Sequence, residues 1–163
     1  MREMPRLNKA PNSPSRFSGK RSGSCILEID SWMPSQIQAI SPLVDHLMGL
    51  IKGSQCVPGA ELDVELALRE ALANAVLHGN QGHAGAKVHV RCRCQPGNKV
   101  SIVVTDQGKG FDIGKIVGNG LTSDRASEHG HGILLMKAYM DDVHFERGGS
   151  QVHMRKRARN SSH

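Results

Sequence analysis

Two runs of alternating residues, 87–94 and 99–106, limit the fold more than any other feature of this sequence. In the first run, valine and cysteine alternate with lysine, histidine and arginine; in the second, every second residue from 100 to 104 is valine or isoleucine. Alternation with a period of two is typical of a strand with one buried face. The residues between the runs, Gln95-Pro96-Gly97-Asn98, favour a turn. The sequence therefore predicts a hairpin whose apolar face must be covered by other elements.

Apolar residues at helical spacing on either side of the hairpin predict the covering layer. The predicted helices run from about 35 to 53, from about 60 to 78 and from 133 to 140. Gly53 and the pair Pro58-Gly59 mark the ends and the loop between the first two helices. The further predicted strands are 25–31, 142–146 and 151–156. This order predicts an α/β (α+β) two-layer sandwich, with a mostly antiparallel sheet covered on one face by three helices.

The charge distribution separates the ends of the chain from its middle. Ten of the 21 basic residues, but only one of the 15 acidic residues, lie before Ser24 or after Met154. The net charge of +6 therefore comes from the ends, while the middle is mildly acidic. With 163 residues and 38% hydrophobic residues, the chain can bury one core. We expect one domain over residues 24–157 and disordered tails over 1–23 and 158–163.

This composition disfavours two classes of function. Binding of RNA or DNA through the basic ends remains an alternative, but an aromatic content of 3% provides no platform on which bases could stack. Solvated ends are the simpler interpretation. No apolar run approaches the roughly 18 residues of a membrane span, and the N-terminus lacks the apolar segment of a signal peptide. We therefore expect a cytoplasmic protein with no membrane contact and no nucleic-acid partner.

Cysteine and histidine do not predict a metal centre. The sequence has four cysteines, and no two of them form a CxxC motif: Cys25, Cys56, Cys92 and Cys94. We expect them to be free buried thiols. Of the nine histidines, only His129 and His131 are close together in sequence, and neither is next to a cluster of cysteines or carboxylates. The sequence therefore predicts no structural zinc site.

Glu70 and Asn74 are the first candidate site residues. They are four residues apart on the second predicted helix, so at about 3.6 residues per turn both lie on one stripe, with His78 one step further. A solvated face is the alternative, but such a face usually carries more than one thin line of polar residues. Asn74 offers magnesium a neutral oxygen ligand. Glu70 can accept a proton beside it.

Two glycine-containing motifs follow. In Asp106-Gln107-Gly108-Lys109-Gly110, an acid ends a strand and the glycines allow close approach of a flat ligand. Asp106 can accept a hydrogen bond from the exocyclic amine of adenine, an interaction that guanine does not offer at that position. Taken alone, this motif is more often an ordinary turn. In Gly130-His131-Gly132, paired glycines precede an apolar helical pattern, as in helix N-termini that bind phosphate.

Taken in this order, the three motifs resemble the nucleotide-binding motifs of the GHKL (histidine-kinase-like) ATPase superfamily. The likeness is greatest to one branch, the bacterial anti-sigma-factor serine/threonine kinases, and it extends over roughly residues 25 to 156. The resembling stretches are 68–79, 104–112, 130–136 and 140–143. The resemblance implies the Bergerat fold for a kinase domain over 24–157, with ATP as substrate and Mg²⁺ as cofactor.

The resemblance also assigns roles to single residues. The residue matching Glu70 activates the attacking hydroxyl, the residue matching Asn74 holds the metal, and the glycines matching Gly108 and Gly110 lie near adenine. Gly130, His131 and Gly132 match the phosphate-binding motif. Ser150 stands where relatives usually have threonine near the base, so its hydroxyl replaces the usual one.

One departure from the family concerns the terminal phosphate. Many kinase-branch members carry an arginine just before the last glycine pair, where this chain has Ser127-Glu128-His129. Lys115 or Arg125 would then supply the missing positive charge. Both lie in the glycine-dotted segment 114–130, which we expect to be a mobile lid.

The function implied by the resemblance is that of an ATP-dependent protein serine/threonine kinase. Such proteins hold a sigma factor inactive and phosphorylate a small anti-sigma-factor antagonist (STAS-type) on serine, so partner choice depends on the nucleotide. The alternative is a nucleotide-gated binding module that sequesters a partner without transferring phosphate. Histidine-kinase catalysis is disfavoured, because no helix pair with a phosphoacceptor histidine precedes the motifs. The sequence leaves open whether the chain forms a homodimer.

Overall fold

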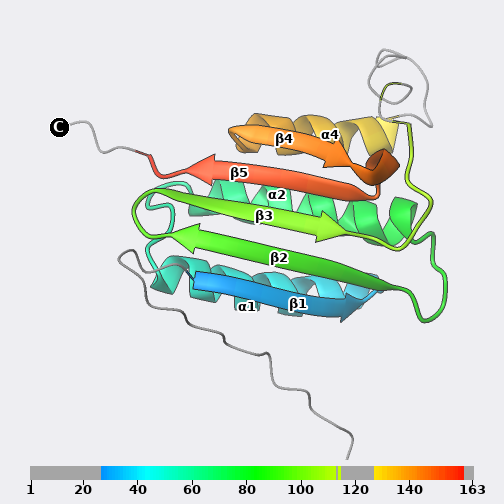
Figure 1. Ribbon diagram of the computed structural model, residues 1–163, viewed down its shortest axis with the longest axis horizontal. Helices are drawn as coiled ribbons and strands as arrows, with labels where there is room; N and C mark the ends of the chain where they lie inside the picture. Colours follow the sequence, from blue (N-terminus) through cyan, green and yellow to red (C-terminus); the bar gives the residue numbers. More distant parts are fainter. Residues whose placement is uncertain (1–26, 113, 115–126, 160–163) are drawn as a thin grey trace, which may run out of the picture.

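The computed structural model describes residues 27–112, 114 and 127–159, without the side chains of 127–129, and within them the chain forms a two-layer sandwich. Its five strands form one antiparallel sheet in the order β1-β2-β3-β5-β4. The strands are β1 Leu27–Pro34, β2 Lys87–Gln95, β3 Lys99–Thr105, β4 Asp142–Glu146 and β5 Gln151–Arg157. The helices α1 Ile40–Gly53, α2 Glu61–Asn74 and α4 Ser127–Tyr139 lie together on one face of the sheet (Figure 1). The predicted fold class is confirmed.

The alternating runs behave as predicted. β2 and β3 form an antiparallel hairpin with Val90 opposite Val104 and Cys92 opposite Ile102. These four side chains are at most 2% exposed and belong to the core between sheet and helices. The alternate residues of β2, among them His89, Arg91 and Arg93, lie on the opposite face of the sheet. The period-of-two pattern therefore predicted the buried face, and the short turn between the runs predicted the pairing.

The second predicted helix consists of two parts. Regular α-helix ends at Asn74, and a π-helical turn, Ala75–Gly79, follows directly. Its wider spacing is visible in the bond from the backbone N–H of Asn80 to the carbonyl oxygen of Ala75, five residues earlier, at 2.8 Å. Single π turns are frequent at functional sites, because they shift the residues that follow relative to an ideal helix.

The third predicted helix begins earlier than expected. The glycine content favoured a start at Ile133, because glycine in a helix interior is less favourable than alanine by about 1 kcal/mol. In the structure α4 begins at Ser127, so Gly130 and Gly132 lie inside the helix rather than before it. The expected boundary is therefore wrong: Gly132 does not precede the helix but stands where another helix approaches closely, as described below. Most of the predicted lid, residue 113 and residues 115–126, lies outside the described residues.

The prediction of free thiols is wrong for two cysteines. Cys56, in the loop after α1, is disulfide-bonded to Cys94 of β2, with the two Cα atoms 5.4 Å apart. The pair is separated by 38 residues, so no short motif indicates it. Cys92 is a free buried thiol, as predicted, and burial raises its pKa to about 12. Cys25 lies outside the described residues.

The ends of the domain stay predictions. Residues 1–26 and 160–163 are outside the described part of the chain. Ala158 and Arg159, which were expected to belong to a tail, make contacts: the N–H of Ala158 donates to the Asn98 carbonyl at 2.7 Å, and Arg159 pairs with Asp63 at 2.9 Å. Among the described residues, no helix combines the length and the apolar character needed to cross a membrane.

Candidate functional site

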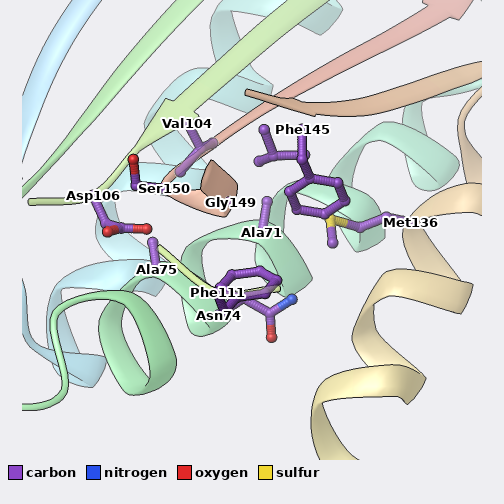
Figure 2. Close-up of a pocket in the computed structure, with 11 residues that line it drawn as sticks. Ala71, Asn74, Ala75, Val104, Asp106, Phe111, Met136, Phe145, Gly149 and Ser150 are labelled. Atoms are coloured by element: carbon purple, nitrogen blue, oxygen red, sulfur yellow. The ribbon is translucent and has the colours of Figure 1, made fainter. Parts of the chain in front are cut away.

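A small pocket lies between the sheet and the helices, where the end of α2 approaches α4 and the loops after β3 and before β5 (Figure 2). Asp106 and Ser150 lie at one end of this pocket, and Phe145 and Met136 lie at the other. The full lining is Ala71, Asn74, Ala75, Val104, Asp106, Phe111, Met136, Phe145, Gly149, Ser150 and Val152. An apolar slot with a few polar groups is the usual form of a small-molecule site.

Asp106 is the buried acid of this pocket, with 9% of its surface exposed. The backbone N–H of Gly108 donates to its Oδ1 at 2.8 Å, and its own N–H donates to the carbonyl of Ser150 at 2.9 Å. Burial raises the pKa of Asp106, an effect that the bond from Gly108 opposes. Burying a carboxylate is costly unless it has hydrogen-bonding partners, which makes this position a candidate for ligand recognition.

Two glycines allow Asp106 to occupy this position. A Cβ atom at Gly79, in the π-helical turn, would overlap the carboxyl group of Asp106. A Cβ atom at Gly108 would overlap the backbone carbonyl of Gly79. The first and second motifs are therefore packed against each other at the backbone, with no room for side chains between them.

Glu70 and Asn74 meet the third motif. Both project from α2 towards α4, where a Cβ atom at Gly132 would lie 3.1 Å from Oε2 of Glu70, 3.1 Å from Nδ2 of Asn74 and 3.2 Å from its Oδ1. Such spacing is tighter than most real contacts, so glycine is what lets α4 approach the two polar side chains. Asn74 also lines the pocket. The geometry therefore places the carboxylate and the carboxamide between the pocket and α4.

The glycine loop after β3 is held against the 3-10 turn Arg147–Gly149. Gly110 has a φ of +78°, and a Cβ atom there would also overlap the carbonyl of Gly148. The N–H of Phe111 donates to that same carbonyl at 2.8 Å. The ring of Phe111 then meets Phe145 edge to face, with centroids 5.9 Å apart. Two aromatic rings thus form one wall of the pocket.

Asn80 is a structural residue of the site that sequence reasoning missed. It is 2% exposed, and its Oδ1 accepts a hydrogen bond from the N–H of Gln107 at 2.8 Å. Its Nδ2 donates to the carbonyl of Lys87 and to Oγ of Ser35, both at 3.0 Å. Asn80 therefore ties the end of the π-helical turn to β2 and to the glycine loop. An asparagine directly after the His78-Gly79 pair was the only available signal, and it reads as loop chemistry.

The residues predicted for the site fall into three groups according to where the structure places them. The structure brings seven of them together: Glu70, Asn74, Asp106, Gly108, Gly110, Gly132 and Ser150. Gly130 and His131 lie one turn into α4, with His131 exposed. Lys115 and Arg125 lie outside the described residues. The apolar lining residues Phe111, Met136 and Phe145 were not predicted as site residues, because their pattern is also that of a core.

Comparison with known families agrees with this geometry. The model of the histidine kinase-like ATPase domain matches residues 33–156, which run from the end of β1 to the penultimate residue of β5. The match spans well over half of the chain and contains all three motifs. The chain belongs to the histidine kinase-like ATPase domain family.

The curated proteins that the chain resembles include a serine-protein kinase and anti-sigma F factors. The chain is 38% identical over 87 residues to the serine-protein kinase RsbW of Bacillus licheniformis, covering 50% of this chain and 54% of the relative. It is 33% identical over 86 residues to an anti-sigma F factor of a Thermoanaerobacter species, covering 52% and 59%. It is 32% identical over 100 residues to an anti-sigma F factor of Clostridium botulinum, covering 58% and 69%. The chain thus spans little more than half the length of the first two.

Proposed function

We propose that this protein is an ATP- and Mg²⁺-dependent protein serine/threonine kinase of the anti-sigma type. The observation that carries the proposal is the meeting of Glu70 and Asn74 on α2 with Gly132 on α4, beside the pocket that contains Asp106. The pocket that could hold a flat ring thus has three groups beside it: a base (Glu70), a metal ligand (Asn74) and the turn of α4 that contains Gly132. This is the set of parts that transfer of a terminal phosphate requires.

Asp106 is assigned to the adenine base. Gly108 holds its Oδ1, and we assign Oδ2 to the exocyclic amine of adenine, with the Ser150 hydroxyl nearby. Phe111 and Phe145 provide apolar surface for the ring. The cavity between the lining side chains has a volume of only about 20 Å³, room for about one water molecule. We propose that the loop that carries Phe111 moves outwards when the base enters.

Glu70 and Asn74 are assigned to the chemistry. The Oδ1 atom of Asn74 is a suitable neutral ligand for Mg²⁺, which takes its other ligands from phosphate oxygens and water. When bound, the ion neutralises charge on the phosphates. Glu70 accepts the hydroxyl proton of the substrate serine. The serine Oγ then bonds to the terminal phosphorus of ATP, and ADP leaves as the bond between the β- and γ-phosphates breaks. We assign Lys115 or Arg125 to the terminal phosphate.

The names of the relatives support a proposal about partners, because two of those described above are anti-sigma F factors. We propose that the chain binds a sigma factor in the cytoplasm and phosphorylates a STAS-type antagonist on serine. A nucleotide-gated module without kinase activity is the second candidate. The small volume of the pocket supports it, because a base that enters by moving the glycine loop would link nucleotide binding to the shape of the surface.

One experiment separates these functions. Purified protein is incubated with labelled ATP, Mg²⁺ and the STAS-type proteins encoded in the same genome, and the label on serine is measured. Glu70→Gln is expected to lower transfer by about 10² to 10⁴-fold while Mg-ATP binding stays nearly intact, because a general base acts in the transition state. Glu61→Gln, in the first turn of the same helix, is the matched control and should keep wild-type transfer. Nucleotide-dependent partner binding without label would favour the module instead.

A further inference from the structure

The outer face of the sheet, opposite the helices, carries a cluster of two histidines and a glutamate. His144 on β4 and His153 on β5 are direct partners in the antiparallel register. Glu146 is two residues further along β4 and therefore projects from the same face. The two strands lie side by side at one edge of the sheet (Figure 1). The turn between β4 and β5 thus brings His144 and Glu146 close to His153. The spacing of these three residues in the sequence matches no short metal-binding motif.

The side chains of this cluster converge. Oε1 of Glu146 lies 3.6 Å from Nε2 of His144, and Oε2 lies 3.2 Å from Nε2 of His153. The two imidazole rings are stacked, with centroids 4.7 Å apart. One ligand atom from each of the three residues lies within 4.8 Å of the others. Zinc bonds of about 2.0 to 2.2 Å in a tetrahedron place neighbouring ligand atoms about 3.4 Å apart, so the observed spacing needs only small side-chain movements.

A second carboxylate stands behind one of the histidines. Oδ2 of Asp142 lies 3.6 Å from Nδ1 of His144. A carboxylate in this position orients a ligating imidazole and makes its other nitrogen a better ligand. On the other side, Oε1 of Gln151 lies 3.1 Å from Nε2 of His153, and Gln151 is itself fixed by a bond to Thr105 at 2.8 Å. Nε2 of His153 is the nitrogen that also faces Glu146, so binding of the ion through Nε2 replaces the hydrogen bond to Gln151.

We propose that His144, Glu146 and His153 bind a divalent transition-metal ion of the zinc class. Imidazole nitrogen favours zinc over magnesium, which prefers oxygen ligands only. The three side chains are 51%, 52% and 26% exposed, so water takes the fourth position. Strand alternation turns Phe145 towards the nucleotide pocket and its two neighbours away from it, so the ion and the proposed nucleotide lie on opposite faces of the sheet. The proposal is thus independent of the proposed kinase activity.

The test is a calorimetric titration of the full chain with ZnCl₂, without nucleotide, at about pH 7.5, where imidazole can bind metal. One ion should bind at micromolar concentration, and His144→Ala and His153→Ala should each lower the affinity about tenfold or more. His89→Ala is the matched control. His89 lies on the same face and pairs with Asp30 at 2.7 Å, but within the described part of the chain it has no third ligand. This variant should bind zinc like the wild type.

A second measurement keeps the result clear if a histidine variant folds poorly. Glu146→Gln changes no volume, and it should weaken zinc binding and alter the visible spectrum of bound Co²⁺, which reports on the ligand set. Zinc binding of undiminished affinity in the His144→Ala/His153→Ala double variant would place the ion elsewhere and overturn the proposal. Absence of stoichiometric binding by the wild type, or an unchanged Co²⁺ spectrum in Glu146→Gln, would overturn it as well.

Discussion

Gly132→Ala should separate the stability of this protein from its activity. Alanine is more favourable than glycine in a helix interior by about 1 kcal/mol, and Gly132 lies inside α4. The new methyl group, however, would lie 3.1 Å from Oε2 of Glu70 and from Nδ2 of Asn74. One helix or the two side chains must then shift by a few tenths of an ångström. Because a 1 Å misplacement of reacting groups costs about 10²-fold in rate, we expect roughly a tenfold loss of phosphate transfer.

Two measurements on the same samples test this expectation. Urea denaturation should give a free energy of unfolding equal to the wild type or up to about 1 kcal/mol higher, since the helix gain offsets the tight contact. Transfer from labelled ATP should fall. The matched control is Gly49→Ala in α1, where an added Cβ meets nothing within 4 Å, so stability should rise with no change in activity. Wild-type transfer and wild-type Mg-ATP affinity in Gly132→Ala would show that α4 does not seat against Glu70 and Asn74 as described.

Two further substitutions test the pocket and its support. Asp106→Asn should lower ATP affinity by about 1.5 to 3 kcal/mol, measured by calorimetry, because the charged acceptor for adenine is lost. Burial raises the pKa of Asp106, so the ionised carboxylate lowers the stability of the folded state at neutral pH. Asparagine carries no charge, and the variant should therefore be no less stable than the wild type at pH 7. A destabilised variant with unchanged ATP affinity would contradict both assignments. Asn80→Ala should lower the free energy of unfolding by about 1 to 3 kcal/mol in urea denaturation, because it removes the hydrogen bonds of a buried side chain to the N–H of Gln107 and the carbonyl of Lys87. A loss below about 0.5 kcal/mol, the usual size of a surface substitution, would show that Asn80 is not the clamp described here.

Much of the architecture follows from periods that are local in the chain. The alternation in β2 and β3 determines which side chains face the helices, because successive residues of a strand point to opposite faces. The spacing of Glu70 and Asn74 places both on one side of α2 for a similar reason. Asp106, at the end of β3, was likewise identified from the glycines that follow it. Such relations need no knowledge of the rest of the molecule.

Relations between distant segments depend instead on register and packing. The disulfide of Cys56 with Cys94 and the stacked pair His144 and His153 exist because a loop or a strand meets its neighbour at one particular residue. A shift of one position in register would turn every side chain of a strand to the other face, so no local pattern specifies these contacts.

The start of α4 shows the same division. Glycine at 132 disfavours a helix when only local propensity is considered. In the folded protein it is the residue that lets α4 pass close to Glu70 and Asn74, where any Cβ would be crowded. The local motifs therefore indicated which residues form the site, while packing between α2 and α4 brought them within reach of one another.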